Sequence, residues 1–113
     1  MSLGQKQELF ARLLPALLNH VHLMGYEMRL GDLFRDPRVH GEVGVKQGYG
    51  HRNSCHKLKL AIDINLMRDG VYLEGAAAQI AHNGIHDYWD MLGGSERIAH
   101  DLNHYSLEHS GMR

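Results

Sequence analysis

Histidine is the outlier in this chain, accounting for ten of its 113 residues. A chain of this length and average composition would carry roughly two or three. Neutral imidazole is the commonest metal ligand among protein side chains, so the excess directs attention to histidines spaced near acidic residues. The chain holds one cysteine, which excludes an internal disulfide. The fold must therefore depend on its hydrophobic core or on a metal.

The first candidate pair is His56 and Asp63, seven residues apart around the start of an alternating apolar segment. Asp63 falls on the polar face of that predicted strand, where a carboxylate requires a partner, a metal or solvent. Since seven is odd, the two side chains would point to opposite faces of a straight strand. They can share a metal only if His56 lies in the turn before the strand, or if a bulge changes the alternation. The alternative is a solvated aspartate and a loop histidine.

The second candidate pair is Asp101 and His104, three residues apart at the entry to a short predicted strand. Zinc held by three protein ligands keeps its fourth position for water. The metal lowers the pKa of that water towards about 7, and a nearby carboxylate can take its proton as it attacks a carbonyl. Two histidines, one aspartate and a separate carboxylate would thus be a complete set for amide hydrolysis. The alternative is that Asp101 caps a turn and His104 is a half-buried strand residue.

A third pair, His82 and His86, has the four-residue spacing that places two histidines on one helix face. The usual metalloprotease version carries glutamate directly after the first histidine, whereas Asn83 stands there and cannot act as a base. Gly84 also weakens the helix. We therefore interpret this pair as part of a solvated helix face rather than as a metal site.

The remaining reactive residue types have simpler interpretations. Cys55 could be a soft ligand, but a lone cysteine is more often a small buried residue. Arg35, Arg38 and Arg52 lie in a glycine-rich segment and could hold a substrate carboxylate by a bidentate pair, although most loop arginines are solvated. Trp89, at helical spacing, is expected in the core.

The elements that must position these residues follow from hydrophobic periodicity. Pro15 should kink the first helix or mark where it restarts. The order of helices and short antiparallel strands indicates an α+β fold. The predicted elements are a helix over about residues 5–24 within an N-terminal segment 1–25, a strand over 26–30, a long irregular loop over 31–55, a strand over 58–67, a tight turn at Asp69-Gly70 with a return strand over 71–73, a helix over 77–92 and a strand over 102–107.

Length and charge narrow the classes of function. We expect residues 1–113 to form one domain, since a core of this size does not split. The net charge of −1 argues against a nucleic-acid binder, which presents a basic face. No apolar run approaches the roughly 18 residues of a membrane span, and the N-terminus lacks the pattern of a secretory signal.

Residues 54–63 resemble a known metalloenzyme signature. They are similar to the S-x-H-x-x-G-x-A-x-D pattern of zinc-dependent D-alanyl-D-alanine carboxypeptidases and phage L-alanyl-D-glutamate endopeptidases. Ser54, His56, Ala61 and Asp63 fit this pattern. Lys59 stands where the pattern has glycine.

The resemblance covers roughly residues 26–113. As in the family's second half, a Gly-Gly turn precedes a D-x-x-H motif, here Asp101 to His104, which is followed by the aromatic Tyr105. Arg35 fits the arginine of the family's upstream G-x-R-T-like segment, with Asp36 in place of the threonine. The compact length is similar to that of phage-encoded members.

The resemblance implies a zinc peptidase of peptidoglycan with a small α+β fold, an antiparallel sheet and flanking helices, like the hedgehog signalling domain. His56, Asp63 and His104 would bind Zn²⁺, and Asp101 would be the catalytic base. In the family the first histidine sits just before the strand, which removes the conflict with alternation.

Supporting roles follow from the same resemblance. Arg35 would steady the carbonyl oxygen of the substrate or one of its carboxylates, and Ser54 would support the metal loop. The long loop over 31–55 would then be an active-site loop. Whether Arg35 or Arg52 contacts the substrate stays open.

The expected partner is the peptide stem of bacterial peptidoglycan, bound by a monomer without membrane insertion. The cut bond could be L-Ala–D-Glu, D-Ala–meso-diaminopimelate or D-Ala–D-Ala. We expect synthesis in the cytoplasm of an infected cell and release through a pore made by another protein, or carriage in the virion. The alternative is a catalytically inactive, metal-stabilised binding or virion-assembly domain of the same fold. A more distant one is a structural domain whose histidines bind nothing.

Overall fold

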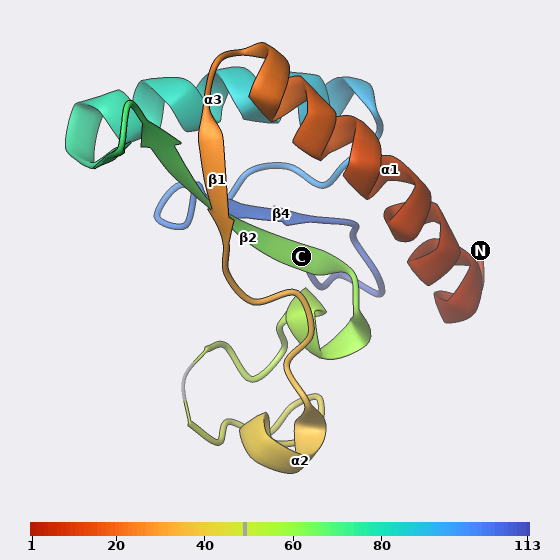
Figure 1. The fold of residues 1–113 in the computed structure, drawn as a ribbon. Coiled ribbons are helices and arrows are strands. Elements are labelled where there is room, and N and C mark those ends of the chain that lie inside the picture. Colours follow the sequence, from red (N-terminus) through yellow and green to blue (C-terminus); the bar gives the residue numbers. More distant parts are fainter. Residues whose placement is uncertain (49) are drawn as a thin grey trace.

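The chain folds into an α+β structure with a small, open antiparallel sheet and flanking helices (Figure 1). The computed structural model describes residues 1–48 and 50–113, so Tyr49 of the predicted loop lies outside the described residues. The elements in chain order are α1 (Leu3–Leu23), β1 (Glu27–Leu30), α2 (Pro37–His40), the short 3₁₀ helix η1 (Cys55–Leu58), β2 (Ala61–Arg68), β3 (Val71–Tyr72), α3 (Gly75–Met91) and β4 (His104–Ser106).

Strand β2 is the centre of the sheet. It pairs antiparallel with β1 on one edge and with β3 on the other. Strand β4 pairs with the first three residues of β2. The turn between β2 and β3 is the predicted one, because Asp69 and Gly70 both have positive φ, as a tight hairpin turn requires.

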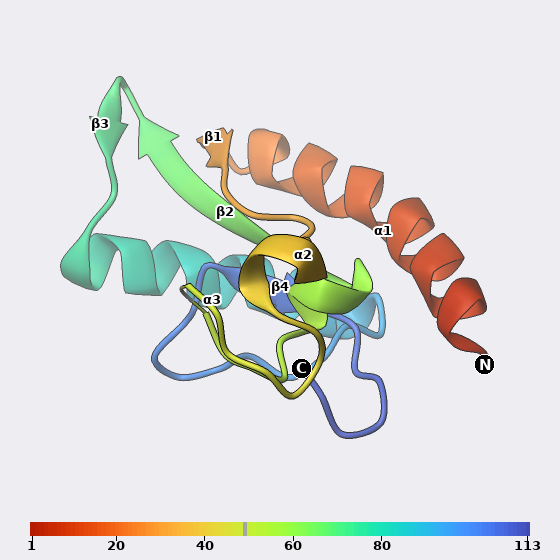
Figure 2. The ribbon, with the colours of Figure 1, turned by 90° about the horizontal axis from the view of Figure 1, so that it is seen from below.

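The core lies between the sheet and the two long helices. In Figure 1 both helices lie on one side of the sheet, and the segment from β1 to β2, with α2, extends away from them. Figure 2 shows the same segment in front of the sheet when the molecule is seen from below. Trp89 is fully buried, as expected, and meets Phe10 of α1 edge to face. The main core residues are Phe10, Leu17, Val21, Leu60, Ile62, Ile64, Leu66, Ala81, Ile85, Trp89 and Tyr105.

Helix α1 has a strong start and a defined end. Ser2 and Gln5 form a capping box, in which each side chain accepts a hydrogen bond from the other residue's backbone N–H. Gly25, with φ of 90°, turns the chain away. The helix runs from Leu3 to Leu23 without a restart, although Pro15 lies inside it. Of the two outcomes expected at Pro15, a kink or a restart, the restart is therefore wrong.

The boundaries of two predicted strands also need correction. Strand β2 begins at Ala61 rather than at residue 58, because Leu58 ends η1 and Lys59 takes a left-handed conformation with φ of 58° and ψ of 36°. Strand β4 covers His104–Ser106 rather than residues 102–107. Alternation of apolar residues does not reveal this turn, because Leu60 is buried here just as a continuous strand would predict.

In the described part of the chain, no helix is both long enough and apolar enough to cross a membrane.

Candidate metal centre

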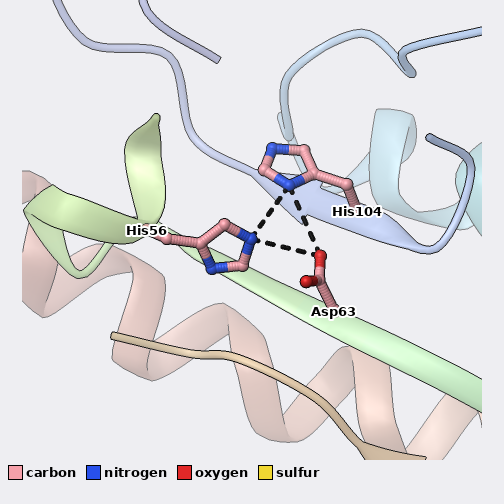
Figure 3. A group of neighbouring side chains, drawn as sticks. All are labelled: His56, Asp63 and His104. Atoms are coloured by element: carbon pink, nitrogen blue, oxygen red, sulfur yellow. Dashed lines mark hydrogen bonds and ion pairs between the residues drawn. The ribbon is translucent and has the colours of Figure 1, made fainter. Parts of the chain in front are cut away.

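Three side chains from three elements meet at one point (Figure 3). His56 comes from η1, Asp63 from β2 and His104 from β4. His56 Nε2 lies 3.1 Å from Asp63 Oδ1 and 3.2 Å from His104 Nδ1, and His104 Nδ1 lies 3.5 Å from Asp63 Oδ1. Both histidines are buried, and the side chain of Asp63 is 19% exposed. The three residues form a buried group that could bind a metal ion.

The backbone before β2 brings His56 to the same side as Asp63. Ser54 caps η1 by accepting a hydrogen bond from the His56 N–H through its side chain. Lys59 then reverses the chain in the left-handed conformation. His56 therefore lies in a turn before the strand, which is the condition that the odd spacing required. The alternative of a solvated aspartate and a loop histidine is wrong.

The register of β2 and β4 brings Asp63 and His104 together. They are direct cross-strand partners. The N–H and C=O of Asp63 bond instead to Asp32 and Gly31 on the opposite edge. Asp63 and His104 are thus a non-hydrogen-bonded pair, the type in which side chains approach most closely.

The electrostatics favour an ionised carboxylate. Burial opposes the charge on Asp63, but hydrogen bonds from His104 and then His56 outweigh it and hold the pKa of Asp63 below its usual range. His56 Nδ1 lies 3.2 Å from the Leu33 carbonyl oxygen. A carbonyl only accepts, so Nδ1 carries a proton, and Nε2, which faces Asp63 and His104, is the nitrogen that would give its electron pair to a bound metal.

The spacing of these atoms fits a divalent cation. Zinc bonds of about 2.0–2.2 Å at tetrahedral angles separate ligand atoms by about 3.3 Å. The three measured separations lie within a few tenths of an ångström of that value. Two imidazoles and a carboxylate also form a donor set of the kind found in catalytic zinc sites.

A cleft of about 570 Å³ opens beside the group. Asp101 lines it, with a carboxylate 53% exposed and Oδ2 placed 3.9 Å from His104 Nδ1. The Asp101 carbonyl accepts a hydrogen bond from the His104 N–H, so one turn positions both residues. His56, His104, Ser54 and Arg35 also line the cleft.

Arg35 faces the protein as well as the cleft. Its Nε donates to Asp32 Oδ2 at 3.0 Å, its Nη1 donates to Ser54 Oγ at 3.2 Å, and its Nη2 lies 3.8 Å from Asp63 Oδ2. Arg38 forms an exposed pair with Asp36. Within the described residues, neither Arg38 nor Arg52 lines this cleft.

His82 and His86 are buried, so their interpretation as a solvated face is wrong. Their face of α3 packs against Tyr105: His82 Nδ1 lies 2.8 Å from the Tyr105 hydroxyl, and the ring of His86 stacks on that of Tyr105. His86 Nε2 donates to the Leu102 carbonyl. Burial lowers the pKa of both histidines, to about 4 for His82. Both rings therefore serve packing and are neutral at pH 7.

Cys55 is a small buried residue, as one of its two interpretations proposed. Its Sγ donates to the Leu107 carbonyl oxygen. Burial raises the pKa of the Cys55 thiol to about 11, so it is not an available thiolate.

Sequence reasoning missed three contributors to the site. Asp32 pairs with Arg35, and the Leu33 carbonyl orients His56. Lys57 is buried and donates through Nζ to backbone carbonyls of Glu42, Val45 and Arg52. The side chains of Asp32 and Lys57 give only a weak signal in the sequence, as charges near Arg35 and His56, and the Leu33 carbonyl gives none.

Comparison of the chain with protein-family models, with curated proteins and with solved structures found no significant match.

Proposed function

We propose that this chain is a zinc peptidase that hydrolyses the peptide stems of bacterial peptidoglycan. It would resemble the D-alanyl-D-alanine carboxypeptidases and phage L-alanyl-D-glutamate endopeptidases, with their hedgehog-like fold. The observation that carries the proposal is the convergence of His56, Asp63 and His104 beside a cleft that Asp101 lines. These are the four positions that the signature marks as ligands and base.

The departure at Lys59 is compatible with this resemblance. Where the signature has glycine, Lys59 takes a left-handed conformation, which glycine adopts at least cost. The backbone therefore has the shape that a glycine would favour there, and lysine bears a local strain of about 1 kcal/mol. Lysine in place of glycine therefore adds this strain, and the three candidate ligands still lie together.

Each residue then has a chemical role. When bound, zinc supplies a Lewis acid that polarises the scissile carbonyl and lowers the pKa of a water. Asp101 accepts the proton of the attacking water and delivers it to the leaving amine nitrogen. The bond cut is L-Ala–D-Glu, D-Ala–diaminopimelate or D-Ala–D-Ala. For a chain made in an infected cell, access to the wall would come from a pore made by another protein or from carriage in the virion.

The test is Asp101→Asn, which removes the base and retains the shape of the side chain. Zinc content should stay at the wild-type level, and release of peptides from purified peptidoglycan should fall by roughly 10²–10⁴-fold. Mass spectrometry of the released peptides identifies the bond. Asp69→Asn is the matched control: it lies in the exposed hairpin turn, where asparagine also accepts positive φ, and it should cleave normally.

Two outcomes would contradict the proposal. Undiminished cleavage by Asp101→Asn would remove the assigned base. A wild-type chain that binds zinc and releases no peptide would favour the inactive, metal-stabilised domain instead.

A further inference from the structure

We propose that Arg35, held by Asp32, positions the metal ligand Asp63 and does not bind substrate. The inference rests on the metal centre of the proposed function. It extends to the five residues Gly31–Arg35, named here the support segment, which contacts two of the three ligands.

The support segment fixes His56 from two sides. The Leu33 carbonyl accepts the hydrogen bond from His56 Nδ1, and the Arg35 N–H donates to the His56 carbonyl at 3.0 Å. The first bond sets the tautomer and the orientation of the ring, so that Nε2 points to Asp63 and His104. Bonds of this kind behind a metal-bound histidine tune its affinity for the metal.

The same segment holds the backbone of Asp63. Gly31 N–H donates to the Asp63 carbonyl at 2.8 Å, and the Asp63 N–H donates to the Asp32 carbonyl at 2.9 Å. The backbones of the two segments approach so closely that a Cβ added to Gly31 would lie 3.0 Å from the Cβ of Asp63. The support segment is therefore in direct contact with the ligand that it serves.

The Arg35 guanidinium orients the carboxylate of Asp63. Oδ1 faces the two imidazoles and Oδ2 faces Arg35 Nη2 at 3.8 Å. An arginine on Oδ2 favours binding of the metal through Oδ1 alone. Asp32 holds the opposite edge of the guanidinium through Nε, in a pair where Arg35 is 11% exposed and Asp32 30%.

The surroundings of Arg35 argue against a role in binding substrate. A Cβ added to Gly50 would overlap the guanidinium, so the loop backbone closes over it. A substrate carboxylate would have to displace Asp32, Ser54 or Asp63 from a side chain that is already mostly buried. Each displacement would leave a partly buried charge or hydroxyl without its partner.

The test measures zinc affinity by competition with a chelating dye. Arg35→Gln and Asp32→Asn should each weaken zinc binding by about 10–100-fold, the range found for groups that orient metal ligands. Asp32 is absent from the residues that line the cleft, so its effect cannot come from substrate contacts. The Asp32→Asn variant also keeps the test valid if Arg35→Gln fails to fold.

Two controls isolate the effect. Arg38→Gln breaks a neighbouring, exposed arginine–aspartate pair and should leave zinc affinity unchanged. Val21→Ala lowers stability from α1 and should lower the melting temperature without changing the zinc affinity of the folded chain.

Zinc affinity within twofold of wild type in both Arg35→Gln and Asp32→Asn would overturn the inference. Arg35 would then act on substrate, and only peptide release would fall. Failure of the wild-type chain to bind zinc is a different result, which overturns the proposed function and this inference together.

Discussion

Histidine has two distinct roles in this chain. His56 and His104 direct ring nitrogens at a carboxylate, whereas His82 and His86 are packed against Tyr105. Spacing in the sequence does not separate these roles, because a four-residue interval places two rings on one helix face whether that face meets solvent, a metal or the core. In this structure the face of α3 that carries His82 and His86 packs against Tyr105 of β4, so both rings belong to the packing between these elements.

The buried His82 makes stability depend on pH. The unfolded chain binds a proton at this residue below its usual pKa of 6.5, whereas the folded chain does not until about pH 4. The stability due to this residue is therefore present above pH 6.5 and is lost as the pH falls to about 4. Between pH 7.5 and 5, wild type should lose about 2 kcal/mol more unfolding free energy than His82→Gln.

Urea unfolding of both proteins at the two pH values measures this difference. All other titratable residues are the same in both proteins, so their contribution cancels in the comparison. Equal losses in wild type and His82→Gln would show that His82 is not held neutral by the fold.

At the scale of elements, the segment between β1 and β2 has more structure than its composition indicates. Its glycines and few apolar residues predicted an irregular loop, and the described part contains α2 and a buried ammonium. Lys57 Nζ donates to Glu42, Val45 and Arg52 carbonyls at 3.2, 2.5 and 3.1 Å. The loop is thus closed around a lysine that is adjacent in sequence to His56.

Lys57→Met should loosen this loop more than the whole chain. It retains the length of the side chain but leaves the three carbonyls without their donor, at a cost of about 1–3 kcal/mol for unsatisfied buried groups. We expect amide hydrogen exchange within residues 42–48 and 50–53 to rise at least tenfold, with α1 and α3 much less affected.

Lys59→Met is the matched control, because Lys59 is exposed and methionine in its place has the same backbone preference. It should leave exchange in the loop unchanged. Unaltered protection in Lys57→Met would contradict the role given to the ammonium.

The sequence predicts the regular elements well and the connections poorly. Alternation reveals β2, and apolar spacing reveals α1 and α3, because burial on one face imposes those periods. The left-handed turn at Lys59 has no periodic signal. Because of this turn, His56 lies on the same side as Asp63. The sequence predicted this arrangement only as the condition under which the two residues could share a metal.

At the scale of the whole molecule, the candidate site joins parts that are far apart in the chain. The separation of Asp63 from His104 means that spacing alone favoured unrelated roles for them, and only the resemblance to a signature brought them together. The contacts of Arg35 with Asp32 and Asp63 were beyond prediction, since they depend on how the segment after β1 continues along β2. A metal there would join η1, β2 and β4 across the molecule.

The most direct test of this account is the zinc content of the purified chain after exposure to zinc and dialysis at neutral pH. We predict one zinc per wild-type chain and a large loss in His104→Ala, while His82→Gln, a change at another buried histidine, retains the metal. A wild-type chain without zinc, or a His104→Ala chain with as much zinc as wild type, would contradict the account.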